Sequence, residues 1–591
     1  MVVHFEECCD YEQLNHTIFL QNECINEQRL LERVGAKMNI ADALKFTQMR
    51  MKFFKGRKML LEESFGSVPN TMYFDGDLDR IRAHYEFRKT QELDEFLIDD
   101  TTWHDLTMDE IFKRINPRLT TSGEQYLYYL LRCPVLSEDE YERRHELIKF
   151  MEENRKARLK LQIILSKLGR RRDVKLHEKF ISADVKYGKV ILYIILAILV
   201  VVWPILGFLV FRESQVLPFM IVAQVAFNII FHTWITSGIE YELQTVNYIL
   251  RMIATARKIK KLNLADLAIY FKNFGASVDK LKTLNRIAFS IEDGKGEVMK
   301  DEITMLFMYV LNKGFFIDLI AFELVKNKLG KYHDAIFDIH ETIGALDASI
   351  AVASYRKSLS EFSEPVIHFD KDADISLKIT DMAHPLVKNS VLNSVDTSTS
   401  ILLTGSNASG KSTFLRAVTL NMIMAQSICT TLTKHYEAPA FYIYSSMAIA
   451  DNLLAGDSYF IAEIKSMKRI VDIAKIKRPI FCVIDEILRG TNTVERVSAS
   501  TELLKYLAKQ NTLCFGATHD IELCQLLEQD YQMLHFTETI TEDGQVVFDY
   551  LIRMGPTRTR NAIKLLGALG FDQALVDAAN ARASCYGESG S

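Results

Sequence analysis

A short glycine-containing loop between two apolar runs constrains this chain's fold more than any other feature. The apolar residues 400–404 predict a short buried strand. The loop Gly405–Thr413 (GSNASGKST) fits the pattern GxxxxGK(S/T), and the residues after it predict a helix. Glycines let backbone N–H groups turn toward phosphate oxygens, and the positive end of the helix dipole adds to the attraction. The sequence therefore predicts a phosphate-binding loop in an α/β domain.

The polar residues of this loop have separate expected roles, with ATP as the nucleotide and Mg²⁺ as the ion. We expect Lys411 to reach the β- and γ-phosphates and Ser412 to ligate Mg²⁺. The residues expected to bind the nucleotide through the loop are Gly405, Ser406, Asn407, Ala408, Ser409, Gly410, Lys411, Ser412 and Thr413.

Two later apolar runs end in the polar residues that such a site needs. Residues 479–484 predict a buried strand that ends in Asp485 and Glu486. Asp485 is expected to hold Mg²⁺ through water, and Glu486 is expected to be the general base for the attacking water. Residues 512–517 predict a third strand, after which His519 is placed to sense the γ-phosphate. The alternative is an acidic pair on the surface and a structural histidine.

These motifs resemble, in order and spacing, the ATPase domain of the MutS proteins of DNA mismatch repair. The matching segments are GSNASGKST, DEILRGTNT (485–493) and ATHDIEL (517–523), with His384-Pro385 where that domain opens and residues 550–580 as its helical tail. Residues 451–463 are similar to the family's signature segment, which implies that Ser458 reaches the γ-phosphate of a partner copy. The resemblance also implies that Val391 lies in the segment that contacts adenine.

The resemblance implies an α/β P-loop ATPase of the ABC type, corresponding to MutS domain V, at the C-terminal end of this chain. Catalysis would rest on Glu486, His519 and Lys411, and the metal ligands would be Ser412 and Asp485. It further implies a homodimer with shared ATP sites, and it makes double-stranded DNA a candidate partner.

Upstream, the resemblance is partial. Residues 119–144 and 341–354 look like the helical core and lever helices of MutS. The first 100 residues are too few and too different to form the mismatch-reading domain, and a pair of apolar segments stands where the DNA clamp normally interrupts the levers. Leu488 occupies a position that is usually glycine in the family. The sequence therefore predicts a mainly α-helical core and lever region that is interrupted by a membrane hairpin.

Two uncharged segments of 21 residues, 191–211 and 216–236, are each long enough to cross a bilayer as a helix. The alternative is a helical hairpin buried in a soluble core. Residues 155–189 carry twelve Lys and Arg, whereas the loop between the segments has only Arg212. Positive charge is enriched on the cytoplasmic side of membrane proteins. We therefore expect a multi-pass membrane protein with both termini and the ATPase domain in the cytoplasm.

The second apolar segment contains Gln224, Asn228 and His232. We interpret these residues as hydrogen-bonding groups between helices rather than as a transport path. Two spans make a poor pore, which disfavours a transporter ATPase. The basic run 155–189 is the best candidate for a DNA-binding patch, and a cytosolic membrane flank explains the same charges.

Bulk composition excludes some classes of protein. A net charge of -5 and a pI near 6.3 argue against a chain that binds nucleic acid over its whole surface. The nine cysteines show no CxxC spacing, so reduced thiols are expected rather than disulfides or a zinc site. The first residues lack an apolar run, so no signal peptide is expected.

Five consecutive segments follow from these observations. They are an N-terminal helical region of unknown role (1–100), a MutS-like helical core (101–190), a transmembrane hairpin (191–236), lever helices (237–365) and a MutS-type ATPase domain with a helical tail (366–591). The expected function is an ATP-dependent DNA-binding, mismatch-repair-like clamp anchored at the membrane. The alternative is a membrane-anchored ATP-driven mechanoprotein that acts on protein partners without nucleic acid.

Overall fold

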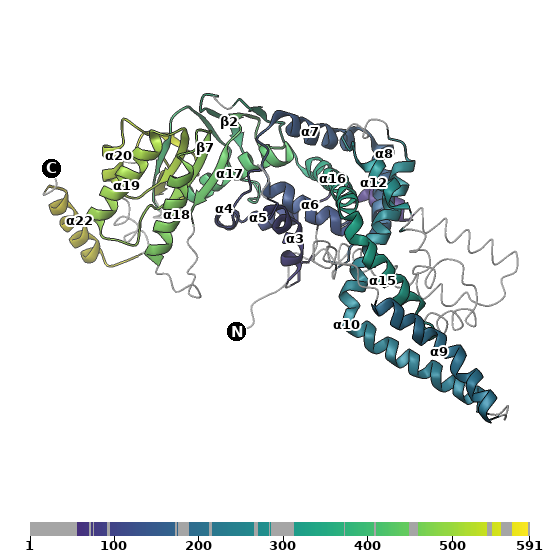
Figure 1. The fold of residues 1–591 in the computed structure, drawn as a ribbon. Helices are drawn as coiled ribbons and strands as arrows, with labels where there is room; N and C mark the ends of the chain where they lie inside the picture. Colours follow the sequence, from purple (N-terminus) through teal and green to yellow (C-terminus); the bar gives the residue numbers. More distant parts are fainter. Residues whose placement is uncertain are drawn as a thin grey trace. The chain divides into compact units, whose positions relative to one another are not determined.

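The computed structural model describes residues 56–69, 72–74, 76–91, 95–171, 174, 188–211, 216–264, 270–282, 284, 313–370, 373–406, 409–447, 459–540, 546–556 and 570–588 (Figure 1). The chain divides into two compact units. Unit 1 comprises residues 1–91, 116–127 and 150–351, and unit 2 comprises residues 92–115, 128–149 and 352–591. The units are interleaved along the chain, whereas the five segments expected from the sequence are consecutive. The bounds of those segments remain predictions.

Unit 2 is built on a six-stranded sheet with the order β12-β9-β4-β8-β7-β6. The strands are β4 (Ile401–Thr404), β6 (Tyr442–Ser446), β7 (Ile480–Asp485), β8 (Thr512–Ala517), β9 (Gln532–His535) and β12 (Arg553–Met554). All neighbours are parallel except β12 and β9. The three strands predicted from apolar runs are β4, β7 and β8, and they are adjacent. Their side chains are almost completely buried, as expected for central strands of a covered parallel sheet.

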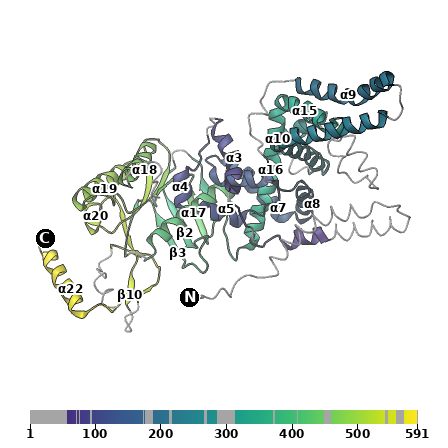
Figure 2. The same cartoon turned by 90° about the horizontal axis from the view of Figure 1, so that it is seen from below.

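Helices α17 (Lys411–Ile428), α18 (Tyr459–Ile473), α19 (Thr493–Ala508) and α20 (Ile521–Leu526) alternate with these strands (Figures 1 and 2). Asn492 caps α19, because its side chain accepts a hydrogen bond from the Glu495 N–H at 3.0 Å. The predicted α/β class is thus present at the C-terminal end of the chain.

The C-terminal end of α17 is held by two buried arginines. Arg356 donates from Nε to the Thr430 hydroxyl at 2.7 Å and from Nη2 to the Cys429 carbonyl. Arg144 donates to the Ser427 carbonyl at 3.2 Å. Cationic groups at a helix C-terminus satisfy free carbonyls and oppose the negative end of the dipole. The helix that begins at the glycine-containing loop is therefore fixed at its far end.

The other elements of unit 2 include two smaller sheets and three helices. A four-stranded sheet has the order β1-β5-β2-β3, and β10 pairs with β11 in an antiparallel hairpin. The sequence Glu542-Asp543-Gly544-Gln545 predicts a turn for this hairpin, and these residues lie outside the described ones. The bounds are β1 (Val366–His368), β2 (Leu377–Met382), β3 (Asn393–Thr397), β5 (His435–Pro439), β10 (Glu538–Ile540), β11 (Val546–Phe548), α4 (Asp100–Asp105), α5 (Met108–Ile115) and α22 (Gln573–Glu588).

The described part of unit 1 is helical, as predicted for the region before the ATPase domain. Its elements are α3 (Asp77–Lys89), α8 (Arg155–Leu168), α9 (Gly188–Phe211), α10 (Val216–Lys261), α12 (Phe274–Lys280), α15 (Ile317–Leu329) and the 3-10 helix η2 (Gly330–Tyr332). Helices α6 (Thr121–Arg132), α7 (Glu138–Glu153) and α16 (His333–Ser358) contribute residues to both units.

Two segments that resemble MutS, 119–144 and 341–354, meet inside unit 1. A Cβ at Gly344 would lie 2.6 Å from the Tyr126 Cβ, and a Cβ at Gly123 would overlap the Asp347 carboxylate. The Thr120 hydroxyl donates to that carboxylate at 2.5 Å. Asp347 is completely buried, and burial raises the pKa of its carboxyl to about 7. The glycines permit an approach that any side chain would block.

Helices α9 and α10 contain the two predicted apolar segments, and both are long and apolar enough to cross a membrane. They lie side by side in both views (Figures 1 and 2). Helix α10 continues to Lys261, beyond the predicted end at residue 236, with a kink at Ile239. Before the kink many of its apolar side chains are exposed, with Trp234 at 72%, and after it most are buried, with Val246 at 0%. The extension exists because this later part packs within unit 1.

Candidate nucleotide-binding site

The loop after β4 depends on two glycines with positive φ. Gly405 has φ 144°, and a Cβ there would lie 2.8 Å from the Ser409 Oγ and 3.0 Å from the Phe536 carbonyl oxygen. Gly410 precedes α17 with φ 108°. Residues with a Cβ adopt such backbone angles only with strain. The glycines of the motif are therefore required by backbone geometry in this loop.

Lys411 is buried at the start of α17. Its Nζ donates to the carbonyl oxygens of Gly405 and Ser406 at 2.8 and 2.9 Å. Burial lowers the pKa of this ammonium, and the carboxylates of Asp485, Glu486 and Glu538 oppose that shift. The ammonium thus lies inside the loop, where phosphate oxygens would compete with these carbonyl oxygens for its hydrogen bonds.

Ser412 and Asp485 form the expected pair of metal ligands. The Ser412 hydroxyl donates to the Asp485 carboxylate at 2.5 Å. Burial raises the pKa of Asp485, and the bond from Ser412 opposes the shift. A hydroxyl and a carboxylate are the hard oxygen ligands that Mg²⁺ prefers. The buried Ser409 Oγ has no hydrogen-bond partner among the described residues, so it is available to a bound nucleotide. These residues fit Mg²⁺ and a phosphate chain.

Glu486 and His519 come together at the ends of β7 and β8. The His519 Nε2 lies 3.1 Å from the Glu486 Oε1 and 3.4 Å from the Lys411 Nζ. The exposed Arg489 donates to the other oxygen of Glu486 at 2.5 Å. Burial and the Lys411 charge lower the pKa of His519. The structure therefore gathers all three residues predicted to be catalytic into one cluster.

Glu463 is a positioning residue that the sequence reasoning missed. Its carboxylate, on α18, accepts hydrogen bonds from the backbone N–H groups of Arg489 and Gly490 at 3.3 and 3.2 Å. Burial raises its pKa. These bonds hold the turn that follows β7, in which Glu486 and Leu488 both have φ 53°. The only available signal was its place at the end of the 451–463 segment.

Val391, expected beside the adenine, is exposed and lies two residues before β3 begins at Asn393. The neighbouring Asn393 donates to the Tyr550 carbonyl at 3.0 Å and accepts from the Ile552 N–H at 2.9 Å. The Tyr550 ring lies 3.1 Å from where a Gly410 Cβ would stand. Tyr550 is therefore a second site residue that the sequence reasoning missed, because its position depends on a contact with a distant loop.

The remaining predicted residues have mixed outcomes. Thr413 is exposed on α17, and the Ser406 hydroxyl donates to Glu538 at 2.9 Å. Asn407, Ala408 and Ser458 lie outside the described residues. Their roles in binding the nucleotide remain predictions.

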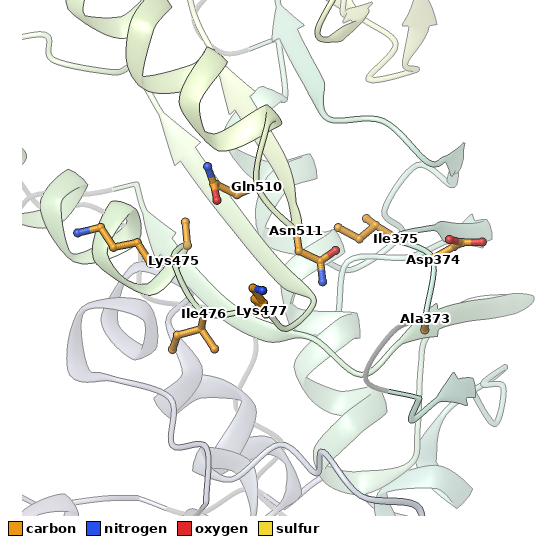
Figure 3. A pocket seen from close by; sticks show the side chains of 9 residues that line it. Ala373, Asp374, Ile375, Lys475, Ile476, Lys477, Gln510 and Asn511 are labelled. Carbon is orange, nitrogen blue, oxygen red and sulfur yellow. The ribbon is translucent and has the colours of Figure 1, made fainter.

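A separate pocket lies near the amino-terminal ends of β7 and β8 (Figure 3). It is lined by residues 373–375, which precede β2, by residues 474–477, which connect α18 to β7, and by residues 510 and 511, which precede β8. Asp374, Lys477, Gln510 and Asn511 are among the residues that line it. The nucleotide motifs follow the carboxyl ends of β4, β7 and β8, which is where ligands bind in open α/β sheets. The predicted site and this pocket are therefore distinct.

The fold and the motif cluster define a P-loop nucleotide-binding domain of the ATPase-type α/β class. Residues 401–585 match the family model of MutS domain V. The chain is 27% identical over 267 residues to the DNA mismatch repair protein MutS of Thermotoga maritima, and the aligned region covers 44% of this chain and 33% of that protein. The chain is 30% identical over 268 residues to the DNA mismatch repair protein MutS of Lactobacillus acidophilus, and the aligned region covers 43% of this chain and 30% of that protein.

These matches support a place in the MutS family for the C-terminal part of the chain. The matched region spans about a third of the length of each relative.

Proposed function

We propose that this protein is a membrane-anchored MutS-type ATPase, which binds ATP with Mg²⁺ and hydrolyses it to drive a clamp that acts on DNA. The single observation that carries the ATPase proposal is the cluster at the ends of β4, β7 and β8. Residues from three strand ends meet there with contacts of 2.5 to 3.4 Å. A lysine, a hydroxyl and two carboxylates supply the phosphate contact, the metal ligands and the base that recur in enzymes of phosphoryl transfer, and the imidazole lies beside the base.

Each group has a defined task in this proposal. Lys411 leaves the carbonyls of its own loop to contact the terminal phosphates, and Ser412 and Asp485 hold Mg²⁺, which neutralises phosphate charge when bound. Glu486 accepts a proton from the attacking water, and His519 orients Glu486 and contacts the γ-phosphate. A Glu486→Gln protein that hydrolysed ATP at the normal rate would remove this residue from the role of base.

We further propose that two copies share each ATP. The support is the resemblance of residues 451–463 to a segment that has no use in a monomer. Ser458 of one copy would contact the γ-phosphate bound to the other. The test is ATP turnover by Ser458→Ala together with a mixture of Ser458→Ala and Lys411→Ala. Turnover that is lost in Ser458→Ala and partly regained in the mixture supports shared sites, because one intact composite site can then form.

Membrane anchoring is supported by the surface of α9 and α10. Between Ile191 and Trp234 many large apolar side chains are more than 38% exposed, and soluble proteins rarely expose such a continuous apolar surface. The basic run before α9 and the basic end of α10 are consistent with a cytoplasmic location for both ends. Fractionation with an alkaline carbonate wash tests the anchoring, because a peripheral protein is released and a spanning protein is not.

DNA is the proposed polymer because the matched relatives are DNA mismatch repair proteins. The deciding experiment measures ATP turnover by the full-length protein in nanodiscs with homoduplex, heteroduplex and branched DNA over a salt series. DNA-dependent turnover that fades with salt supports a DNA clamp, because phosphate contacts release counterions. Turnover that is indifferent to every DNA overturns the DNA proposal and favours the mechanoprotein that acts on protein partners.

A further inference from the structure

The polar residues in the middle of α10 are covered by one particular segment, residues 313–316, which leads into α15. The Asn228 side-chain amide donates to the Gly314 carbonyl at 2.7 Å, and Asn228 is completely buried. The Lys313 Nζ lies 3.3 Å from the His232 Nε2, and the His232 ring stacks on Phe316 at 6.0 Å. The polar groups of the second apolar segment thus bind a distant part of the chain.

Beyond the contact between Asn228 and Gly314, α15 runs alongside α10 with a nearly constant offset in residue number. Gly314 is separated from its partner Asn228 by 86 residues, and Lys326 is separated from its ion-pair partner Glu242 by 84. Because this separation is nearly constant, the two helices run parallel to each other and lie side by side. Helix α9 completes the group, because Tyr193 stacks on Phe316 with ring centroids 5.9 Å apart.

The depth of these contacts follows from helix geometry. The first charged residue after the second apolar segment is Glu240, twelve positions beyond Asn228. At 1.5 Å per residue, Asn228 lies about 18 Å along the helix from that charge. A bilayer has a hydrocarbon core about 30 Å thick. If α9 and α10 cross a membrane, the hydrogen bond to Gly314 must therefore lie inside the hydrocarbon core.

We propose that residues 313–317 form a third membrane-embedded segment, packed on α9 and α10 and in contact with the lipid hydrocarbon. This inference rests on the membrane anchoring proposed above. The side of the segment that faces α9 and α10 is buried, with Phe316 at 0% exposure. Ile317, the first residue of α15, is 39% exposed and presents an apolar side chain to the lipid.

The hydrogen bonds explain why such a segment remains in place. An unpaired amide or carbonyl in hydrocarbon is costly, so the bond between Asn228 and Gly314 favours packing over separation. Ionisable groups inside membranes pair with one another and face the interior of a helix bundle. Lys313 and His232 satisfy both conditions.

The experiment compares single-tryptophan proteins in nanodiscs with and without brominated acyl chains, which quench fluorescence only on contact with the hydrocarbon. The native tryptophans are Trp103, Trp203 and Trp234. One protein keeps only Trp234, which is 72% exposed on α10 and close in register to Ile317. A second replaces all three by Phe and carries Ile317→Trp. A third keeps only Trp103, which is buried in unit 2.

We expect quenching of the Ile317→Trp protein to be within about twofold of that of the Trp234 protein, and no quenching of the Trp103 protein. Quenching of Trp234 without quenching at position 317 overturns the third segment and leaves the anchored hairpin intact. No quenching at either position overturns the membrane anchoring itself.

A disulfide between Val225→Cys and Gly314→Cys, in a protein without its native cysteines, tests the packing independently of lipid. A Cβ at Gly314 would lie 3.8 Å from the Val225 Cγ1, so the two cysteines are close enough to join. Failure of this disulfide to form in membranes also overturns the proposal.

Discussion

The His519 Nε2 lies 3.1 Å from the Glu486 Oε1, although 33 residues separate them in the sequence. This contact joins the ends of β7 and β8 at the expected position of a γ-phosphate. Glu486 is bonded on its other oxygen to Arg489, so the carboxylate is held from two sides. The arrangement leads to the first prediction.

Glu486→Gln should bind ATP normally and hydrolyse it roughly 10²–10⁴-fold more slowly, because the amide keeps the shape and loses the basic oxygen. The measurements are ATP affinity and steady-state turnover in nanodiscs. Arg489→Ala is the matched control. It removes an exposed partner of the same carboxylate, and we expect turnover to change by less than about tenfold. A larger loss in Arg489→Ala than in Glu486→Gln would contradict the assignment of the base.

Leu488 is predicted to be a strained residue, because it has φ 53° at a position where glycine is usual in MutS proteins. Its side chain is buried, so truncation costs stability in either variant. The left-handed conformation costs about 1–2 kcal/mol for a residue with a Cβ. We therefore expect Leu488→Gly to be more stable than Leu488→Ala by about 1 kcal/mol.

The measurement is the midpoint of thermal unfolding of the two full-length variants. The adjacent buried residue Ile487 is the control, since it is not among the residues with positive φ. There the order should reverse, with Ile487→Ala more stable than Ile487→Gly. The same order at both positions would show that backbone strain at Leu488 is negligible.

Asp347 predicts a pH dependence of stability. Burial raises the pKa of its carboxyl from 3.8 to about 7, so the native state binds the proton more tightly than the unfolded state. The free energy of unfolding should therefore fall as the pH rises from about 4 to about 7, by roughly 2–4 kcal/mol. Below about pH 4 the carboxyl is protonated in both the native and the unfolded state, so it adds nothing to the pH dependence of stability.

Asp347→Asn should abolish this contribution while it retains a hydrogen-bond acceptor for Thr120. The measurement is the thermal midpoint of both proteins between pH 4 and pH 8. As the pH rises, the thermal midpoint of the wild-type protein should fall relative to that of the variant. A difference that is constant with pH would place the native pKa of Asp347 near its ordinary value.

Tyr550 should contribute to ATP affinity through its ring, which lies at the start of α17 beside the segment that contains Val391. An aromatic ring that stacks on a base is worth about 1–3 kcal/mol. Tyr550→Ala should therefore raise the Kd for ATP roughly tenfold. Tyr550→Phe, which keeps the ring, should have the Kd of the wild-type protein. The Kd for inorganic triphosphate, which lacks a base, should be unchanged in both variants. An equal loss of triphosphate binding would mean that Tyr550 supports the loop rather than the base.

The nucleotide loop and the apolar segments were accessible from the sequence because each is a local structure. The turn at Gly405–Gly410 needs only consecutive residues with the right backbone freedom, and the strands β4, β7 and β8 follow from uninterrupted apolar runs. The length of an apolar segment likewise decides whether it can span a bilayer. The residues at the strand ends could be predicted to meet, because parallel strands bring their carboxyl ends to one edge.

Tertiary structure alone decided the partners of residues far apart in the chain. Nothing local marks Glu463 as the acceptor for the turn after β7, or Tyr550 as the neighbour of Gly410. Asn228 could be identified as a hydrogen-bonding residue, but its partner Gly314 is 86 positions away. Asp347 is an ordinary carboxyl in the sequence, and its pKa is raised because the fold buries it completely. A periodic pattern determines which face of a helix is buried, whereas packing determines what it is buried against.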